Sequence, residues 1–425
     1  MSDTTSDASG ATAPRVVLGV AGGIAAYKAC EVVRRLREAG CDVTVVPTAN
    51  ALKFVGAAAW EALSGKRVNT DVWSDITEVP HVRLGQTADL VAVVPATADL
   101  LSRAATGRAD DLLTNVLLTA HGPVAMFPAM HTEMWQHPAT VENVATLRRR
   151  GVVVKDPAAG RLTGADTGPG RLPEPAEIAA ICLQLLAGGH EATARIAAQD
   201  LAGRRVVVSA GGTHEALDPV RFLGNSSSGL MGVAIAREAS LRGAEVELVA
   251  ANMQAEPPSG VTVTRVVSTE DLHAAMQRAA ADADAVVMAA APADFTPASV
   301  SEGKIKKDGD GAPELHLVQT TDVLRSLVTT RTEDATRKGQ VIVGFAAETA
   351  PEAEELLELG RHKLARKGCD LLVLNDVSGG KVFGLPSTRV VVIDSAGAVA
   401  QAEGTKAEAA AVIVEAIRRS LAARD

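Results

Sequence analysis

The fold of the first half of the chain is decided by one stretch, Val16-Val-Leu-Gly-Val20 followed at once by Ala21-Gly22-Gly23-Ile24. A short β-branched run that ends in glycines predicts a buried strand, a tight turn and the start of a helix. A second start of this kind lies at Arg205–Ser209, followed by Gly211-Gly212-Thr213. We therefore expect an α/β protein with two Rossmann-like domains, each built on a parallel sheet.

Further Val- and Leu-rich runs alternate with helical periodicity along the whole chain. In the first half, Val32, Val33 and Leu36 share one helical face. The other predicted strands are 43–46, 90–94, 124–127, 246–249, 261–266, 285–288, 341–345, 371–374 and 390–393. Short strands that alternate with helices are typical of βαβ units.

The chain has 425 residues, which favours two domains over one. Residues 1–14 are mostly small and polar without an apolar core, so we expect a disordered tail rather than a signal peptide. Residues 189–203 are polar and Ala-rich and are predicted to be a linker. The predicted domains are therefore 15–188 and 204–425.

The composition excludes several classes of protein. The chain is 47% hydrophobic and only 2% aromatic, and its net charge of -9 argues against a nucleic-acid partner. No apolar run is long enough to span a bilayer, so we expect no membrane partner. The cysteines are scattered without a CxxC pair, which argues against disulfides and zinc and favours a cytoplasmic location: they are Cys30, Cys41, Cys182 and Cys369.

The glycine turn at Gly22 and Gly23 brings backbone N–H groups close to any phosphate or flavin ring placed there. It is neither GxGxxG nor a P-loop, which makes a dehydrogenase with two dinucleotide-binding domains remote. A plain turn between strand and helix explains it equally well. Thr97 likewise suits either a helix cap or a ligand contact, because it follows the strand that ends at Pro95.

His81 precedes that same strand and by itself would be read as an ordinary surface histidine. The carboxyl end of the strand should open into a ligand crevice, however, and this makes His81 a candidate for the site. The Gly-rich stretch from Gly160 to Arg171 is interpreted as a mobile flap over a site, with a disordered loop as the alternative.

Five motifs of the first half, in this order, resemble the homo-oligomeric flavin-containing cysteine decarboxylases: GxAGGIAAYK, PH, VPATADL, PAM and TGPGRL. The resemblance covers roughly residues 15–185 and implies a flavodoxin-like domain that binds FMN. It implies that His81 is the catalytic histidine. The residues it implies at the flavin are Gly22, Gly23, Ile24, Thr48, Pro95, Ala96, Thr97, Ala98 and Met130.

Two positions depart from that family's pattern. His131 follows PAM where the family has an asparagine that holds the substrate carboxylate, and an imidazole still donates a hydrogen bond there. Gly164 stands where the family flap has a cysteine that assists the final reduction. The resemblance therefore makes His131 a catalytic candidate and leaves the last proton donor unassigned.

The second half carries small hydroxyl residues and glycines before a predicted helix, in Asn225-Ser-Ser-Ser-Gly229. This pattern predicts an anion cradle, with a Ser/Gly turn as the alternative. The segment Asp218-Pro-Val-Arg221 precedes it. Farther on, Asp294 ends a strand, and Lys304-Ile-Lys-Lys307 is either a solvated charge run or a phosphate clamp.

The motifs GGTxExxDPVRxxxNxSSGxMG, APADF, GKIKK, VGFAAET and ND together resemble the phosphopantothenate–cysteine ligases over roughly residues 203–420. The bacterial members use CTP together with Mg²⁺. The resemblance implies that the Mg²⁺ ion is held mainly by the phosphates of the nucleotide. The resemblance implies that Asn225 holds the activated acyl group and that Lys304 is catalytic. The residues it implies at CTP or substrate are Gly211, Gly212, Thr213, Ser227, Ser228, Met288, Asp294, Lys304, Phe345, Lys363, Lys367 and Asn375.

The order of the two sets of motifs matches fused bacterial enzymes of coenzyme A biosynthesis. The resemblance implies flavin-domain trimers and ligase-domain dimers, and hence a homo-oligomer, a dodecamer, that acts on 4'-phosphopantothenate, cysteine and CTP. Three alternatives stay open: a flavin prenyltransferase, a decarboxylase of peptide C-terminal cysteines, and a regulatory flavoprotein of the same fold. The ligase-like half argues against the first two.

Overall fold

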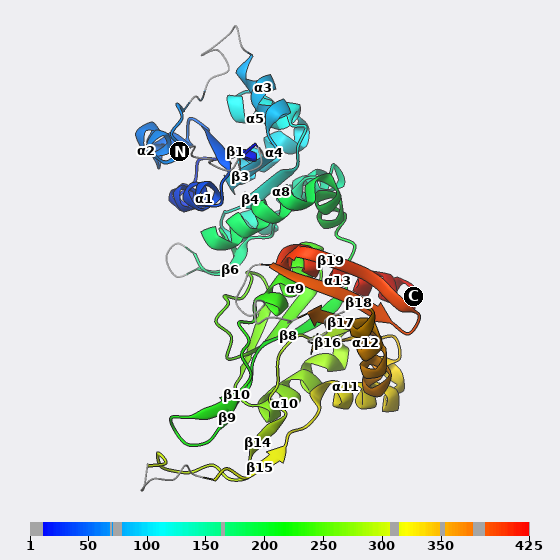
Figure 1. Ribbon diagram of the computed structural model, residues 1–425. Helices are drawn as coiled ribbons and strands as arrows, with labels where there is room; N and C mark the ends of the chain where they lie inside the picture. The colour runs from blue at the N-terminus through cyan, green and yellow to red at the C-terminus, as the bar shows by residue number, and fades with distance from the viewer. Residues whose placement is uncertain are drawn as a thin grey trace, which may run out of the picture. The chain divides into compact units, whose positions relative to one another are not determined.

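The computed structural model describes residues 12–68, 70, 79–162, 166–306, 314–348, 353–376 and 387–424 (Figure 1). The chain divides into two compact units, Met1–Ala198 and Gln199–Asp425, each with its own core. The predicted tail lies outside the described residues as far as residue 11. Among the residues described, no helix is long and apolar enough to cross a membrane.

The first unit alternates strands and helices along most of its length. Its elements are β1 Arg15–Val20, α1 Ala26–Glu38, β2 Asp42–Pro47, η1 Ala51–Lys53, α2 Ala57–Ser64, α3 Pro80–Thr87, β3 Leu90–Ala96, α4 Ala98–Thr106, α5 Leu112–Thr119, β4 Val124–Pro128, α6 Thr132–Gln136, α7 Pro138–Arg149, β5 Val153–Val154, β6 Ala158–Arg161, β7 Thr167–Arg171 and α8 Pro175–Ala198.

The sheet of this unit has the order β2-β1-β3-β4-β5, and all its strands are parallel. This is the flavodoxin-like order, in which the connection reverses direction between β1 and β3 and opens a crevice at their carboxyl ends. One face of the sheet packs against α4, α5 and α7, around Val17, Val93 and Leu101. The predicted face of α1, with Val32, Val33 and Leu36, is fully buried.

The segment 189–203, predicted to be a linker, is helical as far as Ala198. Helix α8 changes direction at Gly189, whose backbone is not helical, and then continues. Beyond this point Ala192, Ile196 and Ala197 are buried. An Ala-rich composition is as typical of a helix as of a spacer, because alanine has the highest helix propensity.

The second unit contains a larger sheet and two separate hairpins. Its elements are β8 Arg205–Gly211, β9 His214–Ala216, β10 Phe222–Gly224, α9 Leu230–Leu241, β11 Glu245–Ala251, β12 Thr262–Val266, α10 Thr269–Ala279, η2 Ala280–Asp282, β13 Ala285–Met288, β14 Phe295–Pro297, β15 Leu317–Gln319, α11 Val323–Glu333, η3 Ala335–Arg337, β16 Val341–Glu348, α12 Ala353–Lys367, β17 Leu371–Asp376, β18 Ser387–Asp394, β19 Gly397–Thr405 and α13 Lys406–Ala422.

Its main sheet has the order β12-β11-β8-β13-β16-β17-β18-β19. The first six strands are parallel and follow the Rossmann order, with the reversal between β8 and β13. The strand predicted at 390–393 is present as β18, but it is antiparallel to β17, and β19 continues the antiparallel edge. The expectation of a parallel sheet thus holds for the first six strands of this sheet.

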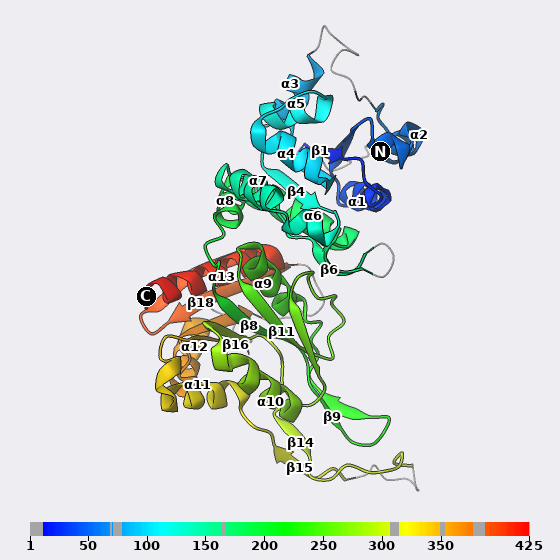
Figure 2. The same cartoon turned by 180° about the vertical axis from the view of Figure 1, so that it is seen from behind.

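Alternate residues of β8 face two hydrophobic clusters, one on each side of the sheet. Val206 and Val208 belong to the cluster that contains α9 and α13. Val207 belongs to the cluster that contains α10, α11 and α12. Figures 1 and 2 show these two sets of helices on opposite faces, so the strand ends at the carboxyl edge are the part of the sheet left for a site.

Candidate functional sites

The first candidate site lies at the carboxyl edge of the sheet in the first unit. Backbone hydrogen bonds join the loops that follow three strands: Ala21 N donates to Pro95 O at 3.1 Å, and Thr48 N to Val20 O at 2.8 Å. Ala129 N donates to Ala96 O at 3.1 Å. The structure therefore brings together the predicted flavin-binding residues, which are Gly22, Gly23, Ile24, Thr48, Pro95, Ala96, Thr97, Ala98 and Met130.

The turn after β1 fits a phosphate-bearing ligand. A side chain at Gly22 would lie 2.5 Å from Asn50 Cβ and 2.9 Å from the Asn50 carbonyl carbon, so only glycine allows this approach. In the part of the chain that the structure describes, no acceptor takes the amide hydrogens of Gly22, Gly23 or Ile24. Consecutive free N–H groups before a helix form an anion-binding cradle. The Ile24 side chain is exposed.

Thr97 caps α4, because its side chain accepts a hydrogen bond from Leu100 N at 3.3 Å. The capping interpretation of Thr97 is thus confirmed. The Thr97 methyl carbon also lies 3.6 Å from where a side chain at Gly23 would begin, so Thr97 lies next to the glycine turn. Both interpretations of Thr97, cap and ligand contact, remain compatible.

The predicted flap begins as a hairpin of β6 and β7 that docks on the segment after β4. Met130 N donates to Gly170 O at 3.0 Å, and Thr132 Oγ1 donates to Pro169 O at 2.9 Å. His131 lies between these two anchor points, at the exposed start of α6. The position of the missing flap cysteine, Gly164, lies outside the described residues.

His81 lies on α3, which packs on α5, and its carbonyl oxygen accepts a hydrogen bond from Thr119 Oγ1 at 2.9 Å. Its ring atom Nδ1 is buried and has no hydrogen-bond partner among the described residues. No hydrogen bond of the described chain joins His81 to the glycine turn. A buried ring nitrogen without a partner is costly, and this marks the histidine as more than a surface residue.

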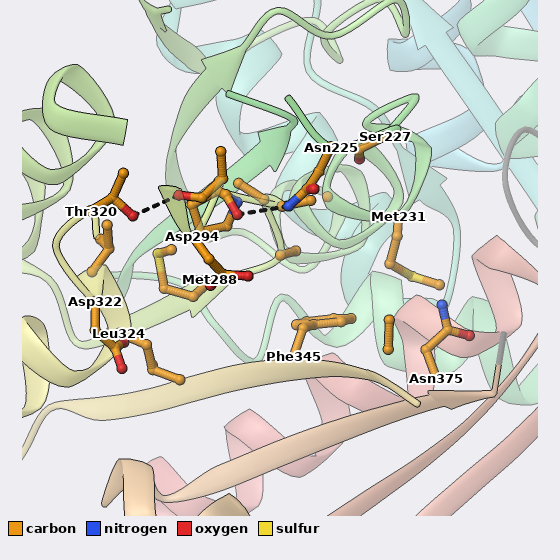
Figure 3. Close-up of a pocket in the computed structure, with 18 of the residues that line it drawn as sticks. Asn225, Ser227, Met231, Met288, Asp294, Thr320, Asp322, Leu324, Phe345 and Asn375 are labelled. Carbon is orange, nitrogen blue, oxygen red and sulfur yellow. Dashed lines mark hydrogen bonds between the residues drawn. The ribbon is translucent and has the colours of Figure 1, made fainter. Parts of the chain in front are cut away.

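The second candidate site is a cavity of about 860 Å³ in the second unit (Figure 3). It lies where β13, β16 and β17 end, and Met288, Phe345 and Asn375 line it from these strands. Figure 3 shows Asp322 at one end and Asn375 at the other, with the ring of Phe345 between them. Its position beside the reversal of strand order is the usual place for a ligand in this fold.

The loop between β10 and α9 forms one wall of this cavity. It contributes Asn225, Ser227 and Ser228, and Asn225 Nδ2 donates to Pro292 O at 2.8 Å. Within the described ranges, the amide hydrogens of 226–229 have no acceptor. Helix α9 has no side-chain cap, so its first N–H groups also remain for a ligand. The wall therefore suits an anion.

The charges of the cavity also favour an anion. Five basic side chains and two carboxylates line it, although the whole chain is acidic: the basic ones are Arg325, Lys363, Arg366, Lys367 and Lys406, and the acidic ones Asp294 and Asp322. Lys367 Nζ lies 2.5 Å from Asp322 Oδ2. Burial raises the pKa of Asp322, but the hydrogen bonds from Lys367 and from Arg325 N, together with the charges of these two residues, outweigh it and leave that pKa below its ordinary value.

Asn375 is held in one orientation at the far end of the cavity. Thr388 Oγ1 donates to Asn375 Oδ1 at 2.9 Å, so the amide nitrogen remains to donate to a ligand. Thr388 pairs with Gly404 across β18 and β19, two residues before Lys406. Burial lowers the pKa of Lys406. This end of the cavity therefore presents two kinds of hydrogen-bond donor, the amide nitrogen of Asn375 on β17 and the amine of Lys406 on α13.

Three predicted residues, Gly211, Gly212 and Thr213, do not line the cavity but contact the loop that does. Ala291 N donates to Gly211 O at 2.8 Å, and Thr213 N donates to Ala291 O at 3.3 Å. Gly211 has a φ of +89°, and a side chain there would overlap the Ala251 carbonyl oxygen. Gly212 forms a bridge with Ala291. Gly211, Gly212 and Thr213 therefore position the loop that carries Asp294.

Lys304 is the predicted catalytic residue that the structure places away from the cavity. It is exposed and lies in a segment that contacts the turn between β9 and β10. Its neighbour Lys307 lies outside the described residues. Of the predicted ligase residues, those that line the cavity are Asn225, Ser227, Ser228, Met288, Asp294, Phe345, Lys363, Lys367 and Asn375.

Several lining residues are absent from the sequence-based prediction: Met231, Thr320, Asp322, Arg325, Arg366 and Lys406. Thr320 and Asp322 had a usable signal, because polar residues before Val323 are typical of a helix start. Asp322 indeed caps α11. The capping-box sequence Thr405-Lys-Ala-Glu408 marks the helix that Lys406 opens, but it does not indicate that this lysine lines the cavity. Over the described residues, no group of three or more His, Cys, Asp or Glu side chains is arranged to hold a metal.

Comparison with known proteins assigns a family to each unit. A family model described as Flavoprotein matches residues 5–187. A model described as the DNA/pantothenate metabolism flavoprotein C-terminal domain matches residues 201–421. The two matches define a flavoprotein joined to a domain of pantothenate metabolism.

The chain is similar over almost its whole length to proteins named coenzyme A biosynthesis bifunctional protein CoaBC. It is 54% identical to the one from Mycobacterium tuberculosis over 410 residues, which cover 96% of this chain and 97% of the relative. It is 40% identical to the one from Vibrio cholerae over 367 residues, which cover 86% and 87%. The chain therefore belongs to the CoaBC family, and both resemblances found in its sequence are confirmed.

Solved structures resemble each half separately. The solved C-terminal domain of a CoaBC protein is 32% identical to this chain, with a TM-score of 0.43. The match covers 53% of this chain and 99% of the solved chain. The FMN-dependent cysteine decarboxylase SpaF is 32% identical, covers 41% of this chain and 98% of its own, and gives a TM-score of 0.37.

Proposed function

We propose that this protein carries out two successive steps of coenzyme A biosynthesis. Residues 204–425 ligate cysteine to 4'-phosphopantothenate, and residues 15–188 decarboxylate the resulting phosphopantothenoylcysteine to 4'-phosphopantetheine. The observation that supports this most is the cation-rich cavity at the strand reversal of the second unit. The relatives that match almost the whole chain are named coenzyme A biosynthesis bifunctional proteins.

The ligation requires activation, because a carboxylate is a poor electrophile at neutral pH. We propose that CTP converts it to an acyl-cytidylate with release of pyrophosphate and that the amine of cysteine then displaces CMP. Asn225 holds the acyl group, and Asp294 and Phe345 contact the nucleotide. Lys363 and Lys367, which line the cavity, neutralise phosphate charge. We propose the same role for Lys304, which does not line the cavity and would have to reach the phosphates from its exposed segment. Mg²⁺ is held mainly by the nucleotide phosphates.

The decarboxylation relies on FMN, which supplies redox chemistry at the substrate thiol when bound. The chain's own residues bind the cofactor and orient the substrate. The free N–H groups of Gly22, Gly23 and Ile24 hold the cofactor phosphate. His131 donates a hydrogen bond to the substrate carboxylate, and His81 accepts and returns a proton there. We further propose a cytoplasmic homo-oligomer, a dodecamer built from flavin-domain trimers and ligase-domain dimers.

The test uses the purified full chain with FMN. Pyrophosphate release is measured with 4'-phosphopantothenate, cysteine, Mg²⁺ and CTP, and CO₂ release is measured separately with phosphopantothenoylcysteine. We expect Lys304→Gln to lower ligation by about a hundredfold and to leave CO₂ release unchanged. His81→Asn should abolish CO₂ release while the protein keeps its flavin absorbance.

The control is Lys338→Gln, which removes the same charge from an exposed position outside the cavity. It should leave both activities unchanged. A protein that takes up no FMN and releases no pyrophosphate contradicts the proposal. CO₂ release from a peptide with a C-terminal cysteine, but not from phosphopantothenoylcysteine, would instead support the peptide decarboxylase alternative.

A further inference from the structure

The motif Asp218-Pro-Val-Arg221 forms the turn between β9 and β10 and does not line the cavity. The Asp218 side chain is fully buried in it. Asp218 Oδ1 accepts hydrogen bonds from Val220 N and Arg221 N, both at 2.8 Å. Asp218 Oδ2 accepts two more from the Arg221 guanidinium, at 2.9 and 2.5 Å. A buried carboxylate with this many donors is built into the turn.

A fifth hydrogen bond leaves the turn and reaches the segment that carries Lys304. Ile305 N donates to Asp218 Oδ2 at 3.1 Å, and Arg221 Nη2 donates to Ile305 O at 2.5 Å. Both backbone polar groups of Ile305 are thus bound by one ion pair. Ser301 N also donates to Leu217 O at 3.1 Å, which fixes the start of the same segment.

The ion pair of Asp218 and Arg221 stays charged at neutral pH. The hydrogen bond from Arg221 holds the pKa of Asp218 well below its usual range, although burial acts in the opposite direction. The carboxylate therefore stays ionised throughout the neutral range and keeps accepting from Ile305. Hydrogen bonds to a charged acceptor are the stronger kind.

We propose that Asp218 and Arg221 form a clamp that positions the segment 301–306 and thereby sets where the Lys304 ammonium group lies. This inference rests on the proposed role of Lys304 in ligation. The two clamp residues are positioning residues, since they touch the backbone beside the lysine and act through it. A displaced ammonium group loses much of its effect, because a shift of about 1 Å can lower a rate a hundredfold.

The main test is Asp218→Asn in the full chain. We expect kcat for pyrophosphate release to fall at least tenfold while CO₂ release from supplied phosphopantothenoylcysteine stays unchanged. The matched control is Asp334→Asn. Asp334 accepts from a backbone N–H and from Arg337 three residues later, in the same Asp–Arg arrangement, but lies outside the cavity. This control should keep full ligation activity.

A double-mutant cycle separates positioning of Lys304 from a general effect on the hairpin. We expect Asp218→Asn to cause less than a twofold further loss in a Lys304→Gln background. Losses that multiply would overturn the inference. Limited proteolysis gives a second readout: cleavage after Lys304 should be at least tenfold faster in Asp218→Asn, and an unchanged rate would contradict the clamp.

The same experiments distinguish the clamp from the function on which it rests. If Lys304→Gln alone leaves ligation intact, the proposed role of Lys304 fails and the inference fails with it. If Lys304→Gln impairs ligation and Asp218→Asn does not, only the clamp is wrong. Should Asp218→Asn not fold, Arg221→Lys replaces it, because lysine cannot bind Asp218 and Ile305 together as the guanidinium does.

Discussion

Thr213 should control the loop that forms one side of the ligase cavity, and replacing it with valine tests this directly. Its side chain is fully buried. Thr213 Oγ1 accepts from Ala293 N at 2.8 Å and lies 2.9 Å from Thr269 Oγ1. Thr269 in turn donates from its N–H and its hydroxyl to Glu215 Oε1, both at 2.8 Å. Thr213→Val keeps the shape of the side chain and removes only the hydroxyl.

The size of the destabilisation follows from the hydrogen bonds that Thr213→Val removes. Ala293 N loses its acceptor in a buried place, which costs about 1–3 kcal/mol, and the net loss of the second hydrogen bond adds about 1 kcal/mol. Thr269 keeps Glu215 as a partner, so its hydroxyl adds no further penalty. We expect the local free energy of opening to fall by about 2–4 kcal/mol. This corresponds to about 30- to 900-fold faster amide exchange.

The assay is hydrogen–deuterium exchange of the peptide that spans 289–295, followed by mass spectrometry. Thr213→Ser is the matched control, because it keeps the hydroxyl and loses only a methyl group. Exchange should be faster in Thr213→Val than in Thr213→Ser, and peptides of the first unit should not change. Equal exchange in the valine and serine variants would refute the reasoning, since the hydroxyl would then contribute nothing to the loop.

Three further predictions follow from other sites. Gly22→Ala should lower thermal stability and flavin absorbance because its side chain would lie 2.5 Å from the loop after β2, whereas Gly23→Ala, with 3.6 Å available, should keep the melting temperature of wild type. Burial raises the pKa of Glu415, but hydrogen bonds from neighbouring arginines lower it from 4.5 to about 2. Its stabilising effect is thus present above pH 4.5 and lost as the pH falls toward about 2. In urea unfolding, Glu415→Gln should be less stable than wild type at pH 7, with a difference that vanishes near pH 2; a constant difference would contradict this. Lys406→Met should raise the KM of a phosphate-bearing ligase substrate about tenfold, and an unchanged KM for both CTP and 4'-phosphopantothenate would exclude that contact.

The inner strands of both parallel cores could be predicted because they are buried on both faces. A run such as Val206-Val-Val208 then consists almost wholly of β-branched residues. The short hairpins lacked this signal. Strands β9 and β10 are three residues long, and Phe222 in β10 is exposed, so neither length nor alternation marks them. Their stability comes from contacts that the local sequence does not contain.

The candidate sites were predictable where a motif coincides with the end of a strand. Met288 and Asn375 follow this rule, and both line the cavity. Arg366 and Lys406 do not, because they come from helices whose position depends on tertiary packing. The placement of Lys304 away from the cavity had no signal either, since it depends on hydrogen bonds to a turn more than eighty residues earlier in the chain.

The antiparallel strands β18 and β19 and helix α13 belong to the smallest part of the chain that we expect to work as a ligase. The six parallel strands contain the whole Rossmann order, yet Thr388, which orients Asn375, belongs to the hairpin added beyond them. Lys406 belongs to the helix that follows this hairpin. A protein shortened to the six parallel strands and their helices would therefore keep the Rossmann order but lose Lys406 and the threonine that orients Asn375.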